Sequence, residues 1–143
     1  MADLNSNTLT NIDRICYCAG IRTCSLGCIV DGGTLFHKGG NRALVYCMRR
    51  NNFCYGAPVS ANWYDTCTWV LGLGTGWFFP TINESIFIYS CTDIRTTFCH
   101  CFWSEERNSG SAHSFRMGCA IRFDSSNKSF FCNYGIAVKS VYY

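Results

Sequence analysis

The sequence predicts an α+β fold in which two short helices precede several short antiparallel strands. Residues 60–72 and 81–89 each begin with a helix-capping residue and then carry apolar residues at helical spacing. After Cys91, apolar residues instead form short runs that turn-forming residues separate. Helices and strands that segregate along the chain in this way are typical of α+β domains. With 143 residues, the chain has room for one such domain.

The first predicted element is a β-hairpin. Two apolar runs, 34–36 and 43–46, flank a turn that contains Gly39 and Gly40. Short apolar runs on either side of a glycine-bearing turn predict paired antiparallel strands. Before them, residues 1–12 are mostly polar and predict an extended arm that is either loose or docked on a partner.

The first predicted helix spans residues 60–72. Ser60 is expected to cap it and Gly72 to end it. The helical spacing predicts one buried face, made of Trp63, Tyr64, Cys67, Val70 and Leu71. The glycine-rich segment 72–76 lacks the Lys-Ser/Thr ending of a phosphate-binding loop and follows a helix rather than a strand. We therefore interpret it as a linker.

The second predicted helix begins with a capping box directly after Pro80. Thr81 is placed to accept hydrogen bonds from the first free amides, and Glu84 to accept one from the Thr81 amide. This pattern commits Glu84 to the helix cap. The face that follows is expected to contain Ile82, Ser85, Ile86 and Tyr89.

The second half of the chain predicts short strands joined by many loops. Apolar runs that favour strands lie at 102–103, 115–117, 120–123 and 136–141. Segments that are expected to break them lie at 108–110, 124–127 and 132–133.

Charge and hydropathy exclude several classes of partner. The net charge of +3 comes from scattered residues, and Arg49-Arg50 is the one adjacent basic pair, so we expect no nucleic-acid partner. The longest apolar runs, such as 86–89, are too short for membrane insertion. The first residues lack the basic start and apolar core of a signal peptide, so no classical secretion route is expected.

Twelve cysteines are the anomaly of the composition, and three interpretations remain open. Buried free thiols come first, because cysteine often behaves as a small buried apolar residue. A few disulfides come second and zinc third, although no pair of CxxC knuckles is present. The closely spaced groups that would serve zinc are 16–18, 24–28 and 99–101, where His100 separates two cysteines.

No arrangement of residues predicts catalysis. Glu105 and Glu106 are adjacent, so on a strand they point to opposite faces and cannot act as a carboxylate pair. His37 lies in the hairpin turn, and His100 is expected to be an ordinary strand residue. No Gly-x-Ser-x-Gly nucleophile motif occurs. We therefore expect no catalytic residue, no metal site and no cofactor.

Several segments, taken together, carry a family resemblance. They are Gly-Gly-Thr-Leu-Phe at 32–36, Arg-Ala-Leu-Val at 42–45, the helix at 62–71, Trp-Phe-Phe-Pro-Thr at 77–81, Asn-Glu-Ser-Ile at 83–86, Phe-Trp-Ser-Glu-Glu at 102–106 and Ile-Ala-Val-Lys-Ser-Val at 136–141. In this order, residues 27–143 resemble a bacterial and phage family of C-type-lectin-like domains. That family is closely related to the variable proteins of diversity-generating retroelements.

The resemblance implies a C-type-lectin-like ligand-display domain at 27–143, preceded at 1–26 by an attachment arm and first strand. It also implies a variable face whose codons are rewritten by adenine-directed mutagenesis in diversified members. The ligand-binding residues on this face would be Arg107, Asn108, Ser109, His113, Ser114, Arg116, Arg122, Phe123, Asp124, Ser125, Ser126, Phe130, Phe131, Asn133 and Tyr134, and Cys132 would be a further changeable position.

Large rings in these polar surroundings are costly unless they pack or bind. We expect Phe131 and Tyr134 to be exposed, whereas Phe123 and Phe130 fit a core position equally well. Exposed aromatics mixed with Arg, Asn and Ser are typical of protein-recognition surfaces.

The resemblance implies a phage receptor-binding protein at a tail-fibre tip or elsewhere on the virion, assembled in the host cytoplasm. Its partners would be a host-cell surface protein or glycan and, through the N-terminal arm, other virion or fibre proteins. A homo-oligomer such as a trimer would suit a fibre tip.

Other functions remain open. One is a bacterial surface adhesin of the same fold, located at the cell surface. Another is a cysteine-dependent metal-binding or redox protein, since formylglycine-generating oxidases share this broad fold. A disulfide-stapled toxin is a further alternative. Calcium-dependent sugar binding requires a carboxylate-and-amide cluster such as Glu-Pro-Asn, which the sequence lacks.

Overall fold

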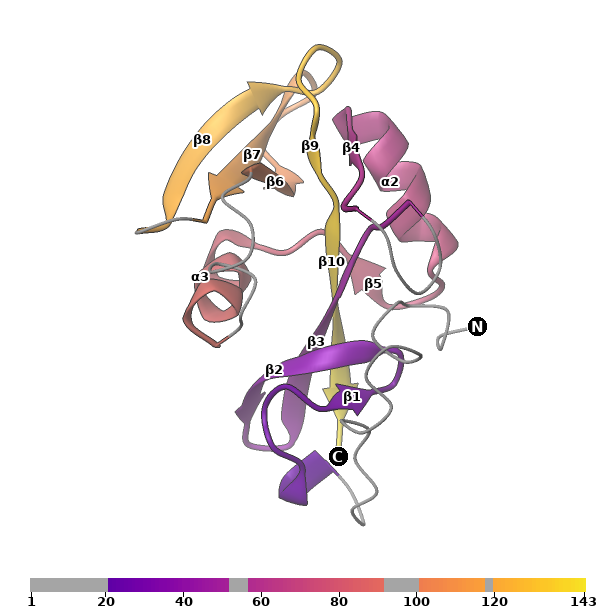
Figure 1. The fold of residues 1–143 in the computed structure, drawn as a ribbon, viewed down its shortest axis with the longest axis vertical. Helices are drawn as coiled ribbons and strands as arrows, with labels where there is room; N and C mark the ends of the chain where they lie inside the picture. The colour runs from indigo at the N-terminus through magenta and orange to yellow at the C-terminus, as the bar shows by residue number, and fades with distance from the viewer. Residues whose placement is uncertain (1–20, 52–56, 92–100, 118–119) are drawn as a thin grey trace.

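The structure, a computed structural model, describes residues 21–51, 57–91, 101–117 and 120–143. Over these ranges, two α-helices and ten strands form two five-stranded sheets, a mostly β arrangement of the predicted α+β class. The two sheets lie toward opposite ends of the molecule in Figure 1. The predicted arm at 1–12 lies outside the described residues. No helix in the described ranges is long and apolar enough to cross a membrane.

The first sheet contains the predicted hairpin and the C-terminal strand. Its order is β1 (Ile29–Val30), β2 (Gly33–Gly39), β3 (Arg42–Met48), β10 (Ile136–Tyr142) and β5 (Trp77–Phe78). The hairpin prediction is confirmed, but the strands extend into the predicted turn and leave Gly40 and Asn41 between them. Gly40 has a φ of 62°, a conformation that favours glycine. β10 pairs antiparallel with β3 along its whole length.

The second sheet holds most of the predicted ligand-binding residues. Its order is β4 (Ser60–Ala61), β9 (Asn133–Tyr134), β6 (Cys101–Glu106), β7 (Ser111–Arg116) and β8 (Arg122–Asn127). Its strands pair antiparallel except for β6 and β9, which are parallel. The predicted break at 108–110 is confirmed as the turn between β6 and β7.

Two predicted breaks in this half are wrong. Residues 124–127 continue β8, where each pairs with a residue of β7. Among the described strands β8 lies at one edge of its sheet, and most of its residues are exposed, so polar residues are accommodated there. Asn133, in the other predicted break, begins β9. In both places, pairing with a neighbouring strand produces a strand although the local sequence has little preference for one.

Helix α2 (Trp63–Gly72) begins at a different cap from the predicted one. The Asn62 side chain accepts a hydrogen bond from the Asp65 amide at 2.9 Å. Ser60 instead belongs to β4 and pairs with Tyr134. The tertiary pairing therefore delays the start of the helix, and the next residue suited to capping takes over.

The predicted buried face of α2 is also partly wrong. Leu71 is 72% exposed and Tyr64 is 47% exposed, whereas Thr66 and Val70 are buried. Helical spacing identifies residues that share a face, but it does not fix which neighbouring face packs against the protein. Here the rotation of the helix places Val70 in the core.

Helix α3 (Ile82–Cys91) confirms the capping box. The Thr81 amide donates to the Glu84 carboxylate at 2.9 Å, and the Glu84 amide donates to Thr81 Oγ1 at 3.1 Å. Ser85 and Ile88 are buried, whereas Ile86, which was predicted on the same face as Ser85, is 39% exposed.

Two apolar clusters lie on the two sides of the first sheet. The cluster that joins both sheets and α3 contains Phe36, Leu44, Tyr46, Met48, Ile88, Phe102, Phe115, Met117, Ile136 and Val138. The cluster on the other side, which includes Val70 of α2, contains Cys24, Leu35, Ala43, Val45, Cys47, Val70, Trp77 and Ala137. Alternate residues of β3 fall in different clusters, as expected for a strand buried on both faces.

Candidate functional site

The loop between β8 and β9 exposes two phenylalanine rings. We call residues 129–132 the aromatic loop. Phe130 is 84% exposed and Phe131 is 55% exposed. Asn127 Oδ1 accepts hydrogen bonds from the amides of Ser129 at 2.8 Å and Phe130 at 3.1 Å, and the Phe131 amide donates to the Asn127 carbonyl at 3.3 Å. An asparagine that bonds to the following backbone fixes a turn, so the two rings project from an ordered loop.

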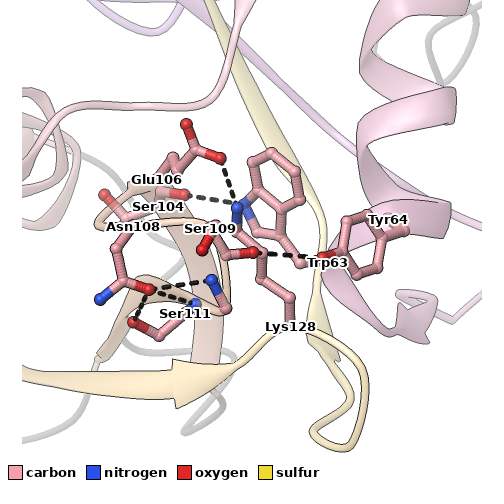
Figure 2. Close-up of polar contacts among 9 residues, drawn as sticks. Trp63, Tyr64, Ser104, Glu106, Asn108, Ser109, Ser111 and Lys128 are labelled. Carbon is pink, nitrogen blue, oxygen red and sulfur yellow. Dashed lines mark hydrogen bonds and ion pairs between the residues drawn. The ribbon is translucent and has the colours of Figure 1, made fainter.

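Lys128 anchors the aromatic loop to the rest of the molecule. Its side chain is 2% exposed, and its ammonium group forms an ion pair with the Glu106 carboxylate. The Nζ atom also lies 4.3 Å from the Trp63 ring centroid and 5.8 Å from that of Tyr64 (Figure 2). A buried cation is costly unless a carboxylate or aromatic faces compensate it. We call Lys128, Glu106 and Trp63 the lysine anchor.

The lysine anchor joins three elements of the structure. Glu106 ends β6, Trp63 begins α2 and Lys128 begins the connection after β8. The Trp63 amide donates to the Lys128 carbonyl at 3.1 Å, and Trp63 Nε1 donates to the Ser104 carbonyl at 3.4 Å. These bonds hold the start of the aromatic loop against the first residue of α2, and that residue against β6.

The turn between β6 and β7 lies beside the lysine anchor and is tied to it. Asn108 Oδ1 accepts hydrogen bonds from the Gly110 amide and from the amide and hydroxyl of Ser111, at 2.9 to 3.0 Å. The Tyr64 hydroxyl donates to the Ser109 carbonyl at 3.3 Å, and the Lys128 amide donates to the Gly110 carbonyl at 3.0 Å. Figure 2 shows the turn and the anchor together.

The structure places the predicted ligand-binding residues at different depths. Those that are exposed are Arg107, Asn108, Ser109, Arg116, Arg122, Asp124, Ser125, Phe130 and Phe131, and the changeable Cys132 is exposed with them. Those that are half-buried are His113, Phe123, Ser126 and Tyr134. Ser114 and Asn133 are buried, with exposed fractions of 3% and 8%, so neither presents a surface to a ligand in this conformation.

Exposure decides the open question about the aromatic rings. Phe131 is exposed as predicted. Phe130, for which a core and a surface position were both open, is exposed as well. Phe123 packs against the core, with its ring centroid 6.2 Å from that of Phe115. The predicted exposure of Tyr134 is wrong, because its ring packs against the same core, 6.0 Å from Phe102.

Strand alternation divides the residues of β7 and β8 between two faces. Directly opposite residues share a face and successive residues alternate. His113 lies opposite Ser125 on the same face as the Phe115–Phe123 pair. The Ser114–Asp124 and Arg116–Arg122 pairs therefore lie on the other face. The predicted set forms two surfaces rather than one.

Sequence reasoning missed the lysine anchor. Lys128 stands in a polar run, 124–129, where solvation is the ordinary expectation for a lysine. Its partners come from residue 63 and residue 106, and no spacing rule connects these positions. Glu105 and Glu106 do point apart as predicted: Glu105 Oε2 accepts from the Ile82 amide at 2.8 Å, and Glu106 pairs with Lys128.

A concavity lies between the first hairpin and α3. Its volume is about 350 Å³, and its wall includes the rings of His37 and Phe87, which stack with centroids 4.3 Å apart. Arg42 and Glu84 approach to 3.7 Å at its edge. None of the predicted ligand-binding residues lines this concavity.

The described cysteines support two of the three interpretations. Cys28 is disulfide-bonded, whereas other cysteines carry thiols: Cys47, Cys67, Cys101 and Cys132. Within the described ranges, no three His, Cys, Asp or Glu side chains gather as a metal site requires. Residues 16–18 and 99–100, which belong to the proposed zinc groups, lie outside those ranges.

Cys132 is expected to react with iodoacetamide far faster than Cys47. Burial raises the pKa of the Cys47 thiol to about 12, an effect that the nearby Arg50 guanidinium only partly opposes. Cys132 is exposed on the aromatic loop. At about pH 8, labelling followed by peptide mass spectrometry should modify Cys132 in the native protein and Cys47 only after unfolding. Equal native rates would contradict this expectation.

No protein-family model matches the chain, and a search of the curated proteins finds no match.

Proposed function

We propose that this protein is a non-enzymatic recognition module that binds a host-cell surface ligand, a protein or a glycan, through the aromatic loop. The observation that carries the proposal is the exposure of Phe130 and Phe131 on a loop that the Asn127 turn holds at its start and the pairing of β9 holds at its end. The two rings are adjacent in the loop, and exposed apolar groups that lie together, unlike single ones, mark sites of interaction with a partner.

An ordered loop makes such rings effective in binding. Aromatic anchors dominate the energetics of recognition surfaces, and a loop that is already fixed loses little conformational entropy when a partner binds. The Asn127 turn and the lysine anchor supply this order. The exposed residues of the neighbouring turn, Asn108 and Ser109, would provide the adaptable polar contacts of the rim.

The resemblance of residues 27–143 to C-type-lectin-like variable proteins supports the same function. Two helices, a C-terminal strand that returns to the first sheet and a second sheet that ends in loops are compatible with that fold. On this basis we place the protein on a phage virion, at a tail-fibre tip, with residues 1–26 attaching it to other virion proteins and a trimer as its assembly. A bacterial surface adhesin of the same fold is the alternative setting.

The double variant Phe130→Ala/Phe131→Ala is expected to weaken binding to host cells by tenfold or more, about 1.4 kcal/mol or above. Because both rings are exposed, its melting temperature should stay close to that of the unchanged protein. Flow cytometry with the fluorescently labelled protein on a panel of bacterial strains would measure the binding. Phe78→Ala is the matched control, since this ring is 69% exposed but belongs to β5 of the other sheet.

Two outcomes would contradict the proposal. Equal loss of binding in the Phe78 and loop variants would mean that the aromatic loop is not the contact. Absence of binding to every strain that a parent phage infects would remove the receptor-binding function. Mass spectrometry of purified virions separates the two settings: the protein in stoichiometric amounts supports the tail, and its presence on bacterial cells alone supports the adhesin.

A further inference from the structure

The concavity between the first hairpin and α3 has an aromatic wall. Its volume is about 350 Å³, and its apolar lining consists of Leu44 from β3 with Ile86 and Phe87 from α3. The Phe87 ring stacks on the His37 ring of β2, with the two centroids 4.3 Å apart. Phe87 is nevertheless 37% exposed. Part of its surface is therefore open to a ligand that enters the concavity.

The same concavity is lined by hydrogen-bond donors and acceptors. Arg42 Nε donates to Ser140 Oγ at 3.0 Å and Arg42 Nη2 lies 3.7 Å from Glu84 Oε2, while Nη1 adds two further N–H donors. The amide of Asn83, an exposed residue of the lining, can both donate and accept. The charges of the arginine and the glutamate offset each other, so this lining favours a ligand without net charge.

We infer that this concavity binds one sugar unit of a glycan, without calcium. A pyranose ring has a face of C–H groups, which packs on the electron-rich face of an aromatic ring. Its hydroxyl groups both donate and accept, so they bond to amide, guanidinium and carboxylate groups alike. Phe87 meets the first need, and Arg42 and Asn83 meet the second, within one concavity. The volume is at the lower end of the range for small-molecule sites, as a single sugar requires.

The chemistry of the lining argues against three other classes of ligand. Glu84, the carboxylate of the described lining, accepts from the Thr81 amide at 2.9 Å and faces Arg42, so it is not placed to hold a metal cation. Its negative charge would also oppose an anion that approached Arg42. A wholly apolar ligand would take water away from the polar groups and give them no partners. A neutral ligand rich in hydroxyl groups avoids all three costs.

The sugar site is separate from the aromatic loop. Its lining comes from β2 and β3 of the first sheet and from α3 with its capping residue, whereas the aromatic loop joins two strands of the second sheet. The inference therefore goes beyond the proposed function and does not depend on it. A glycan bound here would be a second ligand contact of the same domain.

The test uses the methyl glycosides of D-glucose, D-galactose, D-mannose and N-acetyl-D-glucosamine as probes, with benzoate as the probe for an anion. Amide chemical shifts of the isotope-labelled protein are followed by NMR during each titration. At least one glycoside should bind with a Kd on the order of 1 mM, the affinity expected for so small a ligand. The amides of residues 83–87 should shift most. EDTA should leave the Kd unchanged, because the site uses no metal.

Two variants and a control locate the binding. Phe87→Ala should weaken it by about tenfold through the loss of stacking, and Asn83→Ala by about fivefold through the loss of amide hydrogen bonds. Asn83 is exposed, so its variant should fold normally and keeps the test valid if Phe87→Ala does not fold. Phe78→Ala removes an exposed ring of β5 that is not part of the lining, and should leave the Kd unchanged.

Several results would overturn the inference. Absence of shifts with every glycoside would do so, as would a Kd that is the same in the Asn83 variant as in the unchanged protein. Tighter binding of benzoate would replace the sugar with an anion, and loss of binding in EDTA would contradict a metal-free site. The Phe130→Ala/Phe131→Ala variant should bind the glycosides at full strength, so failure here is distinct from failure of the proposed function.

Discussion

Replacing Glu106 with alanine is expected to lower the free energy of unfolding by about 3 kcal/mol, a large effect for a half-exposed residue. The reason lies in its partner. Lys128 is 2% exposed, so its ammonium group would remain buried with its carboxylate removed. The Trp63 ring offers some compensation, but a cation–π contact of about 2 kcal/mol does not replace the lost carboxylate.

Replacing Lys128 with methionine should cost less than the Glu106 change, about 1–2 kcal/mol. Methionine nearly preserves the buried volume, and the Glu106 carboxylate that remains is 57% exposed and can be solvated. The double variant should then resemble Lys128→Met alone, because no buried charge is left to compensate. Chemical denaturation of the four proteins completes a double-mutant cycle and gives the coupling free energy directly.

Lys139→Met is the matched control for this cycle. Lys139 forms an ion pair with Asp31 at 2.8 Å, but both side chains are partly exposed, so its loss should cost about 0–1 kcal/mol. Additive effects of the Glu106 and Lys128 changes would contradict the lysine anchor. Glu106→Ala should also weaken binding through the aromatic loop, because the loop begins directly after Lys128.

Replacing Trp103 with alanine is expected to cost about 3–5 kcal/mol and to unfold a protein of ordinary stability at elevated temperature. Trp103 is fully buried in β6, the middle strand of the second sheet. Its Nε1 donates to the Ala61 carbonyl of β4 at 2.8 Å, so the ring also bridges across β9 to the far edge of the sheet. Alanine would remove the ring, leave a cavity and orphan that carbonyl.

Trp103→Phe separates packing from hydrogen bonding. It retains an aromatic ring and loses the donor, so the expected cost is about 1–3 kcal/mol. Thermal and denaturant unfolding should rank the unchanged protein first, phenylalanine second and alanine last. A phenylalanine variant as unstable as the alanine variant would mean that the bond to Ala61, rather than the ring, holds this strand in place.

Much of the local structure was predictable from short-range chemistry. Gly40 requires a positive φ that identifies a turn, and the hairpin follows from the apolar runs on either side of it. Thr81 and Glu84 form their capping box through atoms three residues apart, so the sequence spacing alone specifies the contact. The division of Glu105 and Glu106 follows from the geometry of any strand.

The candidate site was predictable only in part. Phe131 was expected at the surface from its polar surroundings and is exposed, whereas the same surroundings left Phe130 open between surface and core, and the structure exposes it. Tyr134 stands in similar surroundings yet packs against Phe102, because β9 pairs with both β4 and β6 and draws the ring inward. Ser114 is polar yet buried, because its strand, β7, pairs with β6 on one side and β8 on the other.

By itself, the sequence determined the elements whose defining contacts lie within a few residues: the first hairpin, the second helix and its cap, and the α+β class. Tertiary structure alone decided that Asn62 rather than Ser60 caps α2, that polar β8 is a strand and that Lys128 is buried. Each of these depends on partners tens of residues away. A lysine in a polar run is solvated by default, and only the approach of Trp63 and Glu106 from two other elements makes its burial favourable.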